Sequence, residues 1–141
     1  MADAAPPPIP DEALRLFDGK LRMGYVATAR RDGHLSVVPV AVVIRDGTVR
    51  ISSPAPTRKI GNLRQNPRIA VCVPDPEDGR RYLMIRGTAE VAEDTDREFL
   101  DWMARTHMGL AEFPREEPAI PRMVITIRAE RFVMGGTFED H

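Results

Sequence analysis

The chain has 141 residues, of which 43% are hydrophobic and 29% are charged, and its formal net charge is -1. This length suits a single domain with a sizeable core, and the near-neutral charge argues against a surface dedicated to nucleic acid or to a membrane. The one cysteine, Cys72, excludes an internal disulfide and lies in an apolar run, where a buried thiol is expected. No stretch has the pattern of a signal peptide or the length of a membrane span, so the sequence predicts a cytoplasmic protein.

The N-terminal part predicts a tail and then a short helix. Composition divides the chain into a disordered tail at residues 1–9, a domain at 10–137 and a second tail at 138–141. A helix is expected from Asp11 to Asp18, because acidic residues open it and Gly19 can close it. Its expected buried face comprises Ala13, Leu14 and Phe17.

Three strand-like runs follow, separated by Asp-Gly turn signals at residues 32–33 and 46–47. The runs are Gly24–Ala29, Leu35–Ile44 and Val49–Ser53. They predict three antiparallel strands in a meander. Both faces of the middle run are apolar, so we expect it to be covered on two sides, by the core and by a second subunit. Pro39 interrupts this run and predicts an edge or a bulge, either beside a ligand ring or at a simple barrel corner.

The segment from Ser52 to Arg68 predicts a short helix. Thr57 can N-cap the helix, and Pro67 prevents it from continuing. Ile60 and Leu63, three positions apart, give it one buried face.

The start of this helix has the composition of a phosphate site. Arg58 and Lys59 fall in its first turn, where each cation opposes the helix dipole by about 0.3 to 1 kcal/mol unless an anion neutralises it. Free N–H groups, Ser52, Ser53 and Thr57 converge on the same place. The charges alone fit equally well a solvated basic face on a connecting helix.

The C-terminal half predicts further strands and one more helix. The expected strands are Ile69–Val73, Arg81–Val91, and a closing strand made of Met123–Arg128 and Phe132–Met134. Thr95 to Glu98 has the capping-box pattern, so the helix is expected to start there and to run to about Gly109. Its apolar stripe comprises Phe99, Leu100, Met103 and His107. Residues 109–121 contain three prolines and predict a rigid loop of lid-like length.

Reactive constellations are not evident in the sequence. His34, His107 and His141 lie far apart and lack the spacing of metal ligands, and no nucleophile–base pair can be assigned. The Gly-rich motifs of dinucleotide-binding folds and P-loops are absent from the sequence. A protein with a phosphate site and no assigned catalytic side chain suggests chemistry supplied by a cofactor.

The sequence resembles the flavin and deazaflavin oxidoreductases that share the split β-barrel of pyridoxamine 5'-phosphate oxidase. The resemblance runs from about Leu21 to Met134, and its motifs are Gly24–Thr28, Asp32–Val40, Thr57–Arg68 and Ile85–Val91. It implies a mainly β fold with flanking helices, a six- to seven-stranded antiparallel split β-barrel of the FMN-binding type. It also implies a homodimer with the cofactor at the interface.

The resemblance further implies which residues hold the cofactor. The phosphate is expected at Ser52, Ser53, Arg58 and Lys59, with Thr57 and Asn62 in the same motif, and the ring along Val37, Val38, Pro39 and Val40. Weaker candidates for contacts with a small-molecule substrate are Tyr82, Arg86 and Trp102. The alternative for Arg86 is an exposed ion pair of little energetic value, and the alternative for Trp102, the commoner case, is packing at a helix edge.

Within the family, the short chain lacks the C-terminal substrate segment of the pyridoxamine oxidases and is more similar to the branch that uses coenzyme F420. Arg50, Arg58, Lys59, Arg64 and Arg68 supply cations for the longer anionic tail of that coenzyme. The leading hypothesis is therefore an F420-dependent reductase that transfers hydride to a small unsaturated substrate. The alternatives are an FMN-dependent oxidase or reductase on the same fold and a non-catalytic flavin- or F420-binding protein.

Overall fold

The computed structural model describes residues 7–136, so the expectations on the terminal residues 1–6 and 137–141 lie outside the described residues. The elements in chain order are α1 (Asp11–Phe17), β1 (Arg22–Ala29), β2 (Leu35–Arg45), β3 (Thr48–Pro54), α2 (Arg58–Gln65), β4 (Arg68–Pro74), β5 (Tyr82–Glu93), η1 (Thr95–Arg97), α3 (Glu98–His107) and β6 (Arg122–Gly135). The closing strand β6 is continuous, where the sequence predicted two runs.

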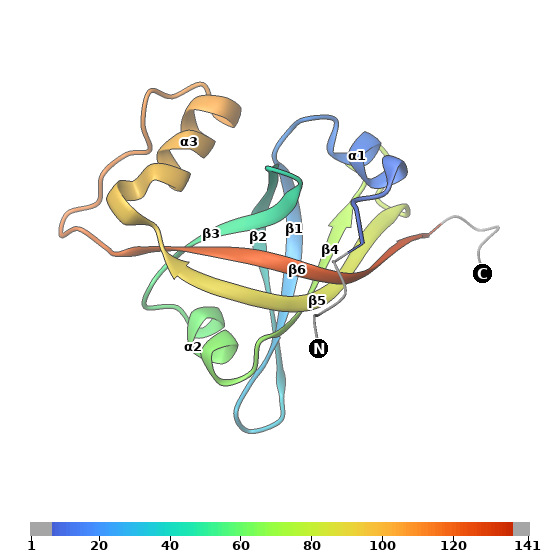
Figure 1. Ribbon diagram of the computed structural model, residues 1–141, viewed down its shortest axis with the longest axis horizontal. Coiled ribbons are helices and arrows are strands. Elements are labelled where there is room, and N and C mark those ends of the chain that lie inside the picture. The colour runs from blue at the N-terminus through green and yellow to red at the C-terminus, as the bar shows by residue number, and fades with distance from the viewer. Residues whose placement is uncertain (1–6, 137–141) are drawn as a thin grey trace, which may run out of the picture.

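The strands close into one antiparallel barrel in the order β1-β2-β3-β6-β5-β4 (Figure 1). This confirms the predicted fold class, with six strands. The meander is also confirmed, because β2 pairs with both β1 and β3. Its two turns place Gly33 and Gly47 at φ values of 90° and 72°, which a glycine adopts without strain.

The barrel interior is filled by the alternate apolar side chains of every strand. Fully buried examples are Val42, Ile51, Val71, Leu83, Ile85 and Ile125. On the inner face of β5, Leu83, Ile85 and Gly87 are buried, whereas Ala89 and Val91 are only half-buried where the strand runs past the core.

The barrel is split between β2 and β3. These strands pair only from Val43 to Arg45, opposite Thr48 to Arg50, and then diverge. Among residues 7–136, Leu35 to Val42 therefore have a strand partner on the β1 side alone. Pro39 lies in this one-sided stretch, in a regular register opposite Tyr25, so the edge interpretation is confirmed and the bulge interpretation is wrong.

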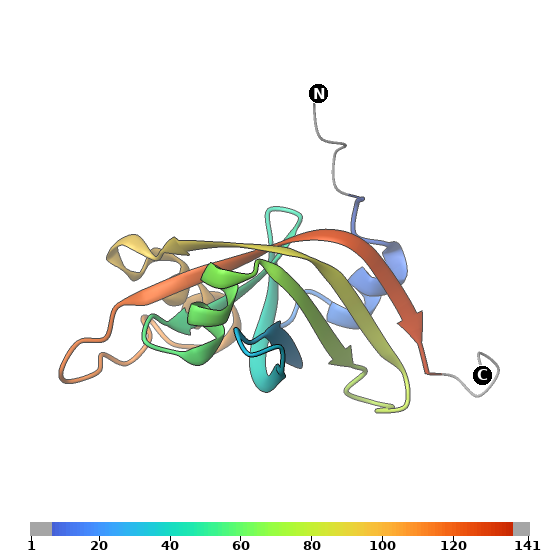
Figure 2. The same ribbon diagram turned by 90° about the horizontal axis from the view of Figure 1, so that it is seen from below.

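Helix α1 forms where the sequence predicted it, but one residue of its buried face was wrong. Ala13, Leu16 and Phe17 are buried, and Leu14 is exposed. The helix ends at Phe17 because Asp18 and Gly19 both adopt left-handed conformations. Helices α1 and α3 lie on opposite sides of the barrel (Figures 1 and 2).

The start of α3 differs from the predicted capping box. Thr95 begins a 3-10 turn, and Asp94 caps the α-helix instead. The Oδ1 of Asp94 accepts a bond of 2.8 Å from the N–H of Phe99, and its Oδ2 accepts one of 2.9 Å from Leu100. A carboxylate that satisfies two N–H groups fixes the helix end more firmly than the single hydroxyl of Thr95 could.

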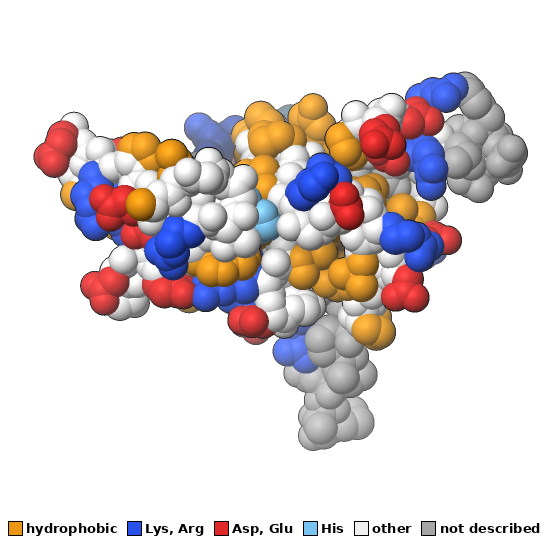
Figure 3. Space-filling model, turned by 90° about the horizontal axis from the view of Figure 1, so that it is seen from above, with side chains coloured by type: hydrophobic (Ala, Val, Ile, Leu, Met, Phe, Trp, Pro, Cys, Tyr) orange, Lys and Arg blue, Asp and Glu red, His pale blue; other side chains and the backbone are white. Residues whose placement is uncertain are grey.

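The face of the molecule in Figure 3 shows acidic and basic side chains interspersed with apolar ones. This mixture agrees with the net charge of -1. None of the helices within residues 7–136 is long and apolar enough to span a membrane.

Candidate functional site

Helix α2 is fixed on the barrel against β1 and β5, at the lower end in Figure 1. Ile60 and Leu63 are buried, as their spacing predicted. Asn62 is buried as well, and its Nδ2 donates a 3.0 Å bond to the hydroxyl of Thr28 in β1. The Asn62 amide therefore orients the helix. Asn62 was predicted to bind the cofactor, and the structure shows its side chain bonded to Thr28 instead.

The hydroxyls before α2 serve the turn that leads into the helix. Ser53 is fully buried, and its Oγ donates to the carbonyl of Pro54 at 3.0 Å. Thr57 occupies the N-cap position, but its hydroxyl donates to the same carbonyl at 3.2 Å and makes no cap bond. The prediction of side-chain capping by Thr57 was wrong. No side-chain cap bond closes the first turn of α2 among the described residues, which leaves its first N–H groups available to a ligand.

Two cations lie close enough to act on one another at this helix end. Lys59 is half-buried, and burial together with the charge of Arg122 lowers its pKa. The Arg122 side chain is only 10% exposed, and its Nη2 donates to the Ser52 hydroxyl at 3.3 Å. Burial is the main factor that lowers the pKa of Arg122, and the nearby Arg97 contributes. The Glu116 carboxylate raises the pKa of Arg122 and so opposes this shift. Its Oε1 lies 3.4 Å from the Nη1 of Arg122, and its side chain is one-third exposed.

Two buried polar atoms of this group lack a hydrogen-bond partner among the described residues, the Nε atoms of Arg97 and Arg122. An unsatisfied buried donor costs about 1 to 3 kcal/mol, more when it is charged. The charges are held in place by the loop at 109–121, because Arg97 donates to the carbonyl of Phe113 and Arg122 lies 5.7 Å from its ring centre. Positive charge that is buried, crowded and incompletely satisfied fits an anion, such as a phosphate group.

Arg122 and Arg97 were missed by the sequence analysis. Arg122 opens the strand β6 and meets Ser52, 70 residues earlier, only because β3 and β6 pair in the barrel. No local pattern marks that contact. The structure thus brings Ser52 and Lys59 together with Arg122, and it leaves Arg58 exposed on the same helix turn.

The predicted ring strand lies along the one-sided stretch of β2. Val37 is 61% exposed and Pro39 is exposed, whereas Val38 is half-buried and Val40 is buried in the core. Alternate residues therefore face outward, and the backbone edge opposite β1 has no strand partner in the part of the chain that the structure describes. Such an edge offers both apolar contact and backbone hydrogen bonds to a planar ring.

The three weaker substrate candidates do not converge. Tyr82 opens β5 and packs over Gly135, where a Cβ atom would lie 2.7 Å from its hydroxyl. Arg86 lies four residues further along β5 and is exposed. Trp102 is on α3, where Arg45 stacks 4.5 Å above its ring and Phe99 packs at 5.7 Å. Its contacts are those of a packed helix edge.

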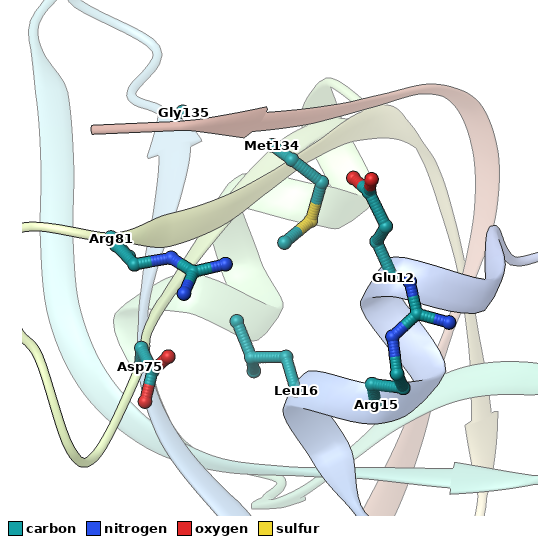
Figure 4. A pocket seen from close by; sticks show the side chains of 7 residues that line it. All are labelled: Glu12, Arg15, Leu16, Asp75, Arg81, Met134 and Gly135. Atoms are coloured by element: carbon teal, nitrogen blue, oxygen red, sulfur yellow. The ribbon is translucent and has the colours of Figure 1, made fainter. Parts of the chain in front are cut away.

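Two cavities of the described chain lie away from Lys59. One, of about 480 Å³, is enclosed by α1, the segment before β5 and the end of β6 (Figure 4). Glu12, Arg15, Asp75 and Arg81 supply its charged walls. The other, of about 740 Å³, crosses the outer surface of the barrel and contains Arg86. Lys59 lines neither of these two cavities.

Comparisons with known proteins identify the same fold. The family model described as pyridoxamine 5'-phosphate oxidase matches residues 10–134. A solved structure described as an F420 reductase is similar with a TM-score of 0.75 and 27% identity, over 89% of this chain and 98% of that one. An FAD-binding protein from Mesorhizobium loti is similar with a TM-score of 0.63 and 22% identity, over 91% and 95%. A candidate pyridoxamine 5'-phosphate oxidase from Listeria innocua gives 0.69 and 18%, over 90% and 98%.

Proposed function

The chain belongs to the pyridoxamine 5'-phosphate oxidase family, and we propose that within it the protein is an F420-dependent reductase acting on a small unsaturated substrate. Membership indicates a flavin-type cofactor and redox chemistry. The choice of F420 is supported by the 27% identity to an F420 reductase over nearly the whole chain. The main evidence for a cofactor that bears a phosphate is Arg122, which is buried beside Lys59 and whose Nε atom has no hydrogen-bond partner among the described residues.

The residues present fit the phosphate of such a cofactor. Lys59, Arg122 and the Ser52 hydroxyl would hold the phosphate, and the free edge of β2 would support the ring. A bound reduced deazaflavin supplies a hydride to an acceptor. The protein's own part is to align the ring with the substrate and to exclude water, and we assign no covalent role to a side chain.

The cations proposed for a longer anionic tail are only partly available. Arg50 is engaged, because its Nε donates to Thr48 at 2.8 Å and Asp46 lies 3.8 Å away. Arg64 and Arg68 are exposed on and after the last turn of α2. An FMN-dependent enzyme is the second candidate, because the Lys59–Arg122 pair by itself needs only one phosphate.

Cofactor identity can be tested on the purified protein. We expect a colourless protein after desalting, saturable fluorescence changes on titration with F420, and reduction of an unsaturated acceptor by reduced F420. Yellow FMN retained through desalting would contradict the F420 proposal. Saturable F420 binding with no acceptor reduced in a broad screen would favour the non-catalytic alternative.

We also propose a homodimer, on the evidence of an apolar outer surface on β1 and β2. Met23, Tyr25, Leu35 and Val37 are 58%, 50%, 73% and 61% exposed. The register places Ala27 opposite Val37 and Ala29 opposite Leu35, so these side chains form one continuous patch on the outside of the barrel. Exposed patches of this kind mark interfaces between subunits.

Light scattering should give a mass of about twice the 15.8 kDa of the chain at micromolar concentration. Tyr25→Asp places a charge in the patch and should shift the mass toward that of one chain, because a buried unpaired charge is costly. Leu110→Asp changes an exposed leucine outside the patch and should leave the dimer intact. A single-chain mass for the unmodified protein would reject the dimer.

A further inference from the structure

The 740 Å³ cleft on the outside of the barrel is lined by three arginines on neighbouring strands, Arg68 on β4, Arg86 on β5 and Arg131 on β6. Its floor contains small apolar residues, including Ala27 and Ala70, and Ala27 also belongs to the apolar patch proposed for the dimer. A volume of this size accommodates a small molecule rather than a single ion.

Strand pairing brings the three guanidinium groups together. Arg86 stands directly opposite Arg131 across β5 and β6. Arg68 stands opposite Thr88, two residues from Arg86, and is thus its diagonal neighbour across β4 and β5. The Cα atoms of such direct and diagonal pairs are about 5 and about 8 Å apart. Like charges placed directly opposite one another destabilise a sheet, so this arrangement calls for an anion to offset it.

No acidic side chain among residues 7–136 forms an ion pair with these arginines. Each of the three guanidinium groups is without an ion pair or a hydrogen bond there. Glu130 also lines the cleft and is likewise unpaired, which leaves an excess of two positive charges. The other face of the same strands is core, so the arginines cannot turn inward.

A β-bulge sets the direction of these side chains. The register of β5 and β6 shifts between Arg86 and Gly87, which leaves Glu130 as the extra residue of β6. Gly87 permits this local approach, because a Cβ atom there would lie 2.1 Å from the carbonyl oxygen of Arg128. Bulges re-aim side chains and are common beside binding sites. Here the bulge places Glu130 and Arg131 at the same cleft.

We propose that this cleft binds a small molecule that carries two or more carboxylate or phosphate groups. Arginine forks match both groups, and three forks within one cleft favour several anionic groups on one molecule over a single one. The apolar floor receives the body of the ligand. Lys59 does not line this cleft, and Arg68 is the residue that the cleft shares with the cations considered for the F420 tail.

Calorimetric titration of the full chain tests the proposal, with citrate and pyrophosphate as probes and acetate as the single-charge control. We expect citrate or pyrophosphate to bind at least tenfold more tightly than acetate, and added salt to weaken the binding. The probe that binds more tightly tells carboxylate from phosphate. Arg86→Ala should weaken binding about ten- to hundredfold, as expected for the loss of a charged hydrogen bond.

Arg81→Ala is the matched control, because it removes the same charge from the other cavity and should leave the affinity unchanged. Arg86→Lys keeps the charge without the fork and should give an intermediate affinity, even if Arg86→Ala does not fold. Equal binding of all three probes, or an equal loss in Arg81→Ala, would overturn the proposal. A third outcome would also overturn the proposal: none of the probes binds, and the dimer dissociates in Arg86→Lys. That result would assign the arginines to ion pairs across the subunit interface.

Discussion

Lys59→Ala should weaken cofactor binding by about ten- to hundredfold and should not lower the stability of the cofactor-free protein. The loss of affinity corresponds to one charged hydrogen bond of roughly 1.5 to 3 kcal/mol. Stability is unchanged or slightly higher because Lys59 opposes the dipole of α2 and is repelled by Arg122. The two measurements are a fluorescence titration with F420, and separately with FMN, and thermal melting of the cofactor-free variant.

Arg64→Ala is the matched control on the same helix. Arg64 is exposed in the last turn of α2, where a cation favours the helix dipole. Its removal should cost about 0.3 to 1 kcal/mol of stability and leave FMN affinity unchanged, the reverse of the Lys59→Ala result. Unchanged affinity for both cofactors in Lys59→Ala, or a clear loss of stability, would make Lys59 an ordinary surface charge.

Arg122→Gln extends the test to the residue that the sequence analysis missed. If Lys59 and Arg122 hold the same anion, their effects are coupled. The variant that combines Lys59→Ala and Arg122→Gln should then lose less binding free energy than the sum of the losses in the two single variants. The coupling between neighbouring groups of this kind is about 0.5 to 3 kcal/mol. Strictly additive losses would place the two cations on different parts of the ligand.

What the sequence predicted correctly depended on signals between near neighbours. The two Asp-Gly turns set the meander, and the helix α2 was bounded by Thr57 and Pro67. Its buried face followed from the spacing of Ile60 and Leu63. Each of these signals involves residues only a few positions apart, so it can be recognised without knowledge of the three-dimensional structure.

What could not be predicted depends on pairing between distant strands. The contact of Arg122 with Ser52 and the opposition of Arg86 and Arg131 both follow from the position of β6 between β3 and β5. The capping error at α3 has a local cause, because a Thr-x-x-Glu pattern competes with an acidic residue one position earlier. Asp94 satisfies two N–H groups rather than one, so the carboxylate prevails.

Gly87→Ala should be among the most destabilising single substitutions in the barrel. The added Cβ would lie 2.1 Å from the carbonyl oxygen of Arg128 and 3.0 Å from the Cα of Ala129. Both neighbours are backbone of β6, so relief requires that the strand itself moves. We expect a loss of about 3 kcal/mol or more and a fall in melting temperature of roughly 10 °C.

Gly61→Ala provides the matched control for the same chemical change. Gly61 lies inside α2, and no atom is within 4 Å of the position that its Cβ would take. Alanine is preferred over glycine within a helix by roughly 0.5 to 1 kcal/mol, so this variant should melt at a higher temperature. If Gly87→Ala melts at the same temperature as the unmodified protein, the β5–β6 bulge can shift at little cost in free energy of unfolding. The bulge could then not hold Glu130 and Arg131 in fixed directions at the arginine-lined cleft.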